Sequence, residues 1–101
     1  MREAKVFQQK KLAGILRELD NGSFSFTYID GYTGEPVSFS MPTKTQVYTF
    51  KKFPAEFEGL LPEGVMLEAF LRINKIDRSD YFSQLIAVGK DLVGSLTIES
   101  C

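Results

Sequence analysis

Apolar and polar residues alternate along the first half of the chain. In "SFSFTYID", Phe24, Phe26 and Tyr28 fall on one side of an extended backbone, and Ser25 and Thr27 fall on the other. This period of two is typical of a β-strand with one buried face. The earlier stretches "AKVFQQ" and "LAGILREL" predict two further strands.

The stretch "VSFSM" repeats this alternation and predicts a fourth strand. Its apolar residues Val37, Phe39 and Met41 are expected to point into the core, with Ser38 and Ser40 pointing away from it. We therefore expect four strands within the first half of the chain.

Short polar segments predict the turns between the first three strands. One is Lys10–Lys11, and the other is Asp20–Asn21–Gly22, whose residues tolerate positive φ in a tight hairpin. Connections this short make neighbouring strands antiparallel. Gly14 is expected to mark a bulge or a close approach of another segment.

The apolar period lengthens in the second half of the chain. Residues 66, 67, 70, 71 and 73 are apolar and share one broad face of a helix predicted from about Glu63 to Asn74. Glu68 and Arg72 lie four residues apart on the other face, a spacing that favours an ion pair. Pro62 fits just ahead of this helix or in its first turn.

A second helix is predicted from Ser79 to Val88. The segment 77–80, "DRSD", offers its N-terminal cap, and Gly89 is expected to end it. The final stretch "LVGSLTI", Leu92 to Ile98, predicts the last strand.

These elements predict an α+β fold, with a mainly antiparallel sheet of about five strands packed by two helices in a single domain over residues 1–101. The predicted core consists of Phe24, Phe26, Phe39, Leu67, Phe70, Leu71, Phe82, Leu85 and Ile86.

The charge of the chain narrows the choice of partners. A formal net charge of −1 lacks the strongly basic balance of a dedicated nucleic-acid-binding domain. Residues 1–53 carry eight Lys and Arg against five Asp and Glu, and residues 54–101 carry four against eight. The acidic second half has two interpretations, a solvated face, which is the commoner case, or a surface that meets a basic partner.

The residue inventory argues against an enzyme. The chain has no histidine, and its one cysteine is the last residue, Cys101. Histidine-dependent nucleophilic triads, disulfide frameworks and cysteine-spaced zinc sites are therefore excluded. Gly89–Lys90 lacks the remaining residues of a phosphate-binding loop, and we expect no cofactor or metal.

No apolar run resembles a signal core or a membrane span, so the expected location is the cytoplasm.

Three stretches form a composite signature over nearly the whole chain. They are "VSFSMP", "FEGLLPEG" and "SQLIAVGKDLVGSLTI", in that order. The last contains a Gly-x-Asp-x-x-Gly strand entry at Gly89, Asp91 and Gly94. In combination, and not singly, these stretches resemble the N-terminal subdomain that precedes the kinase core in HipA-type toxins.

The resemblance also has implications for partners. In HipA-type toxins the subdomain leads into a much longer kinase, whereas this sequence stops at Cys101. The chain is therefore similar to HipS, the stand-alone counterpart of the subdomain in split, three-component HipBST modules. The resemblance implies an antitoxin that neutralises a separate serine/threonine kinase toxin, HipT, with HipB as the DNA-binding companion. It suggests an aminoacyl-tRNA synthetase as the substrate of that kinase.

Other interpretations stay open at this point. An N-terminal regulatory domain excised from a full-length HipA-type kinase would have the same termini. A subunit acting mainly in DNA-linked autoregulation through HipB is another alternative, and a small enzyme is a third. No direct contact with nucleic acid or membrane is expected.

The candidate partner-binding site is the Pro62–Glu63–Gly64 corner, which interrupts an apolar run. In one interpretation the corner is structural, with the leucines buried below the sheet. In the other it projects as a rigid apolar wedge with an acidic tip, since interface energy is concentrated in compact apolar clusters. The predicted partner-binding residues are Phe57, Leu60, Leu61, Pro62, Glu63, Gly64, Val65 and Met66.

Overall fold

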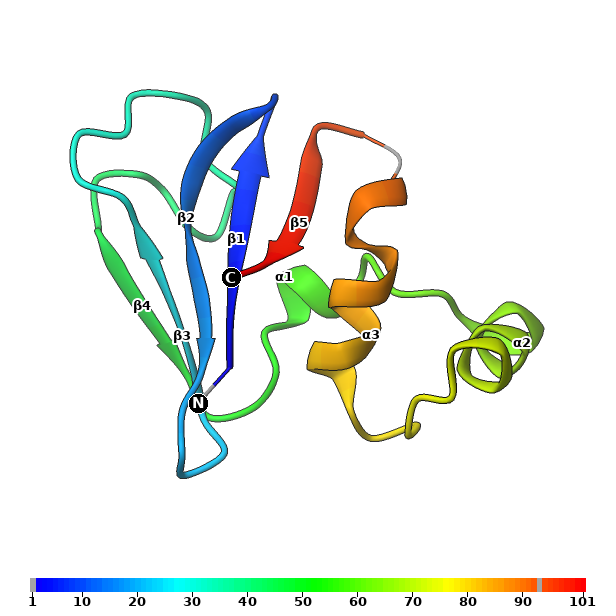
Figure 1. Ribbon diagram of the computed structural model, residues 1–101. Coiled ribbons are helices and arrows are strands. Elements are labelled where there is room, and N and C mark those ends of the chain that lie inside the picture. Colours follow the sequence, from blue (N-terminus) through cyan, green and yellow to red (C-terminus); the bar gives the residue numbers. More distant parts are fainter. Residues whose placement is uncertain (1, 93) are drawn as a thin grey trace.

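The computed structural model describes residues 2–92 and 94–101. Its sheet is five-stranded and antiparallel, in the order β4-β3-β2-β1-β5, and its helices lie to one side of the sheet (Figure 1). The strands are β1 (Arg2–Gln8), β2 (Lys11–Glu18), β3 (Phe24–Tyr28), β4 (Val47–Phe50) and β5 (Leu96–Ser100). The helices are α1 (Ala55–Glu58), α2 (Gly64–Asn74), α3 (Tyr81–Val88) and the 3-10 turn η1 (Gly89–Asp91). The predicted α+β class is confirmed.

The first hairpin turns one residue earlier than predicted. Gln9 and Lys10, with φ of 51° and 68°, occupy its two central positions, and such left-handed pairs match the twist of the flanking strands. Gly14 sits at the predicted close approach, because a Cβ there would lie 2.3 Å from the carbonyl oxygen of Thr27. The β1–β2 register also shifts beside it, between Val6 and Phe7.

The core lies between the sheet and the helices. Phe24, Phe26 and Tyr28 are all buried, as the alternation predicted. The ring of Phe26 lies 5.9 Å from that of Phe57 on α1, so this short helix, which the sequence pattern did not reveal, closes the middle of the core. Phe82 and Leu85 of α3 are buried in the same cluster, and Ile86 packs at its margin.

The stretch "VSFSM" is not a strand, and the prediction was wrong there. Met41 N–H donates to the Ser38 carbonyl at 3.0 Å, which closes a turn with Phe39 at its tip. Val37 and Met41 are buried as expected, but Phe39 is 102% exposed and takes no part in the core. The fourth strand is instead β4, which pairs with β3.

The chain that follows α3 differs from the prediction. The helix stops at Val88 as expected, but η1 continues the chain and β5 starts only at Leu96. Of the strand predicted from Leu92 to Ile98, Val93 lies outside the described residues. A Cβ on Gly89 would lie 2.4 Å from the Ile98 carbonyl oxygen, so glycine lets η1 lie directly against β5. No helix in residues 2–92 and 94–101 has the length and apolar character to cross a membrane.

Candidate functional site

Helix α2 projects away from the rest of the protein. Figure 1 shows it beyond α3, on the side away from the sheet, and it has no extended packing against another element. Two left-handed residues bracket it, Gly64 with φ of 60° and Lys75 with φ of 54°. Such residues turn the backbone sharply, so the chain bends at both ends of the helix.

The exposure of α2 overturns part of the predicted core. Leu67 and Phe70 are only half-buried, and they lie outside the core cluster together with Leu71, which is buried. Met66 and Ile73, which share the apolar face of the helix with them, are 75% and 77% exposed. The apolar period correctly predicted a helix, but most of its apolar surface is left uncovered by the chain.

A groove of about 610 Å³ separates α2 from α3. Its apolar lining includes Leu60, Pro62, Met66, Phe70, Val88 and Leu92. The last two residues follow the predicted site by more than twenty positions in sequence, and nothing in their local pattern distinguishes them from core residues. Asn74 and Asp91 add polar groups to the lining.

The predicted partner-binding residues separate into anchors and exposed groups. Phe57 and Leu61 are 1% and 8% exposed, so they are anchors in the core. Leu60 and Pro62 are half-buried and line the groove. The exposed groups at the start of α2 are Glu63, Gly64, Val65 and Met66. Leu61 is thus buried as the structural interpretation expected, the corner after it is exposed, and the binding role of the corner stays a prediction.

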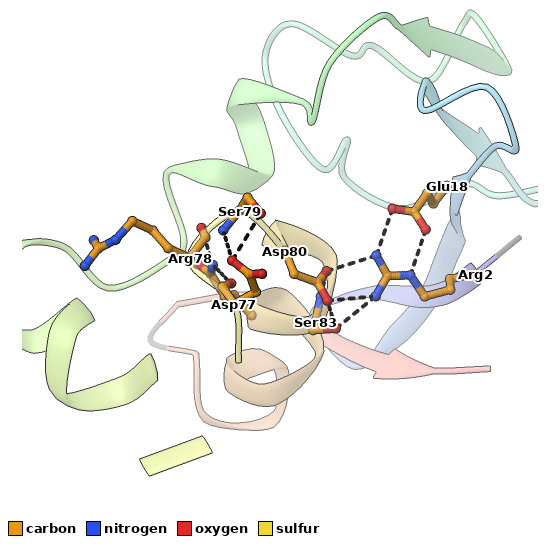
Figure 2. A network of polar contacts seen from close by, with 8 residues as sticks. Arg2, Glu18, Asp77, Arg78, Ser79, Asp80 and Ser83 are labelled. Atoms are coloured by element: carbon orange, nitrogen blue, oxygen red, sulfur yellow. Dashed lines mark hydrogen bonds and ion pairs between the residues drawn. The ribbon is translucent and has the colours of Figure 1, made fainter. Parts of the chain in front are cut away.

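A polar network fixes the position of α3 relative to the sheet (Figure 2). The Arg2 guanidinium makes two hydrogen bonds to Glu18, at 2.7 and 2.8 Å, and two to Asp80, at 2.9 and 3.3 Å. Asp80, the last residue of the segment predicted to cap this helix, is the N-cap of α3 and accepts from Ser83 N–H at 3.1 Å. Arg2 also lies 4.9 Å from the centre of the Phe82 ring. One arginine thus ties β1 and β2 to the start of α3.

The network shifts the pKa of each carboxyl group. The hydrogen bond from Arg2 is the main reason why the pKa of Glu18 lies below its usual value. Partial burial on its own would raise the pKa of Asp80, but hydrogen bonds from Arg2 and Ser83 outweigh it and the pKa is lowered. Both groups are therefore charged at neutral pH.

The connection from α2 to α3 is held by side chains of both helices. Gln84, which is 1% exposed, donates through Nε2 to the carbonyls of Asp77 and Arg78 at 3.2 and 3.0 Å. Arg78 pairs with Glu68 of α2, so the expected Glu68–Arg72 pair is replaced by one that reaches the connecting segment. These contacts attach the C-terminal end of α2 to the folded core.

The described part of the chain holds no cluster of residues that could bind a metal ion. The site offers an apolar groove, exposed aliphatic side chains and scattered carboxylates. Such an arrangement is suited to binding another macromolecule, since exposed apolar surface rimmed by polar residues marks interaction sites.

Residues 4–99 match the HipA N-terminal domain family. The chain belongs to that family. A solved structure of the N-terminal domain of HipA toxin superposes with a TM-score of 0.75 at 30% identity, covering 98% of this chain and 93% of that one. An uncharacterized protein of Haemophilus influenzae is 32% identical over 99 residues, which cover 98% of this chain and 92% of that protein. The chain is thus a domain related to toxin–antitoxin systems. The match covers 96 of its residues and corresponds to the non-catalytic N-terminal domain of HipA, so these residues contain no kinase catalytic domain.

Proposed function

We propose that this chain is a HipS-type antitoxin, which binds a separate HipA-like kinase toxin, HipT, and neutralises it by protein–protein contact. Membership of the HipA N-terminal domain family supports this role. The Haemophilus protein is little longer than the region it shares with this chain, which supports a domain that acts apart from a covalently attached kinase. A HipB-like DNA-binding protein completes the proposed cytoplasmic complex.

The observation that carries the proposal is the uncovered apolar surface of α2 and its groove. Val65 and Met66 are 85% and 75% exposed on a helix that follows the buried Leu61 and precedes the segment bound by Gln84. A rigid apolar projection beside a groove provides the kind of central, desolvated contact in which binding energy is concentrated. Recognition of a protein surface therefore fits this site better than catalysis does.

A domain without catalytic groups silences a kinase only through binding. It either fills the active-site cleft or holds a mobile kinase loop in an inactive arrangement. In this proposal the corner from Pro62 to Met66 faces the kinase, and Glu63 approaches the basic groups that bind phosphate. Phe57 and Leu61 support the corner from below.

The test combines purified protein with the cognate kinase toxin. We expect a stable complex by size-exclusion chromatography, loss of autophosphorylation and rescue of growth when the two are co-expressed. Single variants Glu63→Gln, Val65→Ala and Met66→Ala should weaken binding while circular dichroism stays unchanged. Val47→Ala, which truncates an exposed apolar residue on β4, is the matched control.

Two results would count against the proposal. Failure of the parent protein to bind or inhibit the kinase would overturn the antitoxin role. Tight, salt-sensitive binding of operator DNA by the isolated chain would favour a DNA-linked role instead. If every folded corner variant binds like the parent, the inhibitory contact lies elsewhere on the domain.

A further inference from the structure

Met41 and Met66 are exposed to very different extents. Met41 is 1% exposed within the core cluster, and its carbonyl accepts from the buried Tyr28 hydroxyl. Met66 is 75% exposed in the first turn of α2. Because oxidation of sulfur-containing side chains follows their exposure, the same thioether group is shielded at one position and accessible at the other. The remaining methionine, Met1, lies outside the described residues.

Met66 lines the groove between α2 and α3. Phe70, four residues later, lies on the same face of the helix and lines the same groove. Val88 and Leu92 supply apolar lining from the opposite side. Since Met66 is 75% exposed, a molecule as small as hydrogen peroxide reaches its side chain without any movement of the chain.

Oxidation of Met66 would change the chemistry of this groove and leave the fold intact. The sulfoxide is polar, whereas the thioether is apolar and adaptable in contacts. Covering the sulfoxide oxygen with an apolar surface costs free energy, because it removes the oxygen from water without a replacement hydrogen bond. Met66 takes no part in the core cluster, so its oxidation does not disturb the packing that holds the sheet and α3.

The other oxidisable group near the surface lies outside the groove. Cys101 is exposed, but it lines a separate pocket with Arg2 and Phe82. The exposed aliphatic side chains of α2, Val65 and Ile73, carry no group that a peroxide oxidises under mild conditions. Within the lining of the groove, Met66 is the residue that contains sulfur.

We propose that Met66 is a reversible oxidation site that controls how strongly the α2 groove binds apolar surfaces. A peroxide is the oxidant. One of its oxygen atoms is transferred to the Met66 sulfur, so that the O–O bond breaks, an S–O bond forms and water leaves. The sulfur loses two electrons and the peroxide gains them. A methionine sulfoxide reductase reverses the change, since two thiols form a disulfide while the sulfoxide oxygen leaves as water.

For the kinase partner this inference rests on the proposed function. Met66 belongs to the corner proposed to face the kinase, so a bound kinase shields it and oxidation acts on the free chain. The oxidised chain then binds the kinase more weakly, and the reductase restores binding. The oxidation itself and the change in the groove are properties of the isolated chain and are tested without the kinase.

The first measurement locates the oxidation in the full chain. Trypsin places Met41 and Met66 in different peptides, residues 18–44 and 53–72, so mass spectrometry follows each sulfoxide separately. In dilute hydrogen peroxide, Met66 should oxidise at least about tenfold faster than Met41 in the folded protein. In urea, where both side chains are exposed, the two rates should converge. Equal rates in the folded protein would overturn the inference.

The second measurement tests the groove by hydrophobic interaction chromatography. After peroxide the parent should elute earlier, and treatment with the reductase should return it to its original position. Met66→Leu keeps an apolar side chain of similar volume without sulfur, and it retains Cys101. The difference between the shifts of the two proteins therefore isolates Met66. Equal shifts would mean that its sulfoxide does not alter the groove, and the inference would be wrong.

The third measurement uses the purified kinase, which is added after the peroxide has been removed. By calorimetry, the oxidised parent should bind about tenfold more weakly than the same protein before oxidation, as for loss of a central contact. Met66→Leu is compared with itself, and peroxide should leave its affinity unchanged. If the oxidised parent binds as before, control of the kinase contact is overturned and the antitoxin role stands. If the untreated parent fails to bind, the proposed function fails, and the two measurements on the isolated chain still decide the oxidation site.

Discussion

The sheet with α1 and α3 differs from α2 in how apolar side chains are used. In the first region Phe26, Leu85 and Ile98 are fully buried, and their surroundings come from distant parts of the chain. In the second, Val65, Met66 and Ile73 are between 75% and 85% exposed on a helix with few neighbours. The same residue types serve stability in one place and are available for recognition in the other.

This difference explains how so small a domain can present an apolar projection. The core supplies the fixed ends of α2, through Leu61 before it and through the Gln84-bound segment after it. The chain is thus held before and after the helix, although the helix itself has no extended packing along its length. Substitutions in the two regions should therefore have different consequences, which four measurements can test.

The largest effect is expected in the core. Phe26→Ala should lower the free energy of unfolding by about 3–5 kcal/mol, because it removes a fully buried ring and leaves a cavity. Phe39→Ala is the matched control and should change it by less than about 0.5 kcal/mol. Urea unfolding at equilibrium measures both, and equal losses would break the distinction between the regions.

A smaller loss is expected where η1 crosses β5. Gly89→Ala should destabilise by about 1–3 kcal/mol, because its Cβ would lie 2.4 Å from the Ile98 carbonyl oxygen and the backbones must separate. Gly59→Ala provides the comparison, since its nearest neighbour is 3.7 Å away and its φ is −62°. That variant should be neutral or slightly stabilising, and thermal denaturation of the pair tests the point.

Acid should weaken the attachment of α3 to the sheet. Asp80 and Glu18 have lowered pKa values in the folded protein. Their contribution to stability is therefore complete above their unfolded values, near 3.9 and 4.3, and is lost as pH falls through the folded values. Urea unfolding between pH 5 and about pH 2.5 should show this decline. Asp80→Asn keeps a capping side chain but cannot titrate, so its stability should fall less steeply. An identical slope would contradict the role of Arg2 as a charged clamp.

The smallest effect on stability is expected at the start of α2. Val65→Ala and Met66→Ala should each change the free energy of unfolding by less than about 0.5 kcal/mol, because these side chains are mostly exposed. Chemical denaturation checks this directly. A loss comparable to that of Phe26→Ala would mean that α2 packs into the core in solution and that its exposed face is not available to a partner.

Features set by local chemistry could be predicted from the sequence. The alternation at Phe24, Phe26 and Tyr28 identified a strand and its buried face, and the segment 77–80 was correctly expected to contain the cap of α3. The local pattern failed at Phe39, because "VSFSM" has the same alternation as a strand. Whether such a segment pairs depends on the strands beside it, and here the Tyr28 hydroxyl takes backbone groups at its two ends instead, the Val37 N–H and the Met41 carbonyl.

The candidate site was only partly accessible from sequence. The corner at Pro62–Gly64 was visible because it interrupts an apolar run. Leu61 was correctly expected to be buried, but Leu60 is half-buried and lines the groove. The groove was not visible, since Val88 and Leu92 join it across more than twenty residues of intervening chain. Periodicity shows which residues share a face of a helix, but it does not show whether another segment covers that face.

The sequence by itself determined the α+β class, the two longer helices, the second hairpin turn and the lack of histidine and disulfide chemistry, because these follow from composition and short-range periodicity. Only the tertiary structure decided that α2 stands off from α3, that Phe39 points outward and that β4 completes the sheet. These features depend on which surfaces meet when the chain folds, and contacts between distant residues are not encoded in any local pattern.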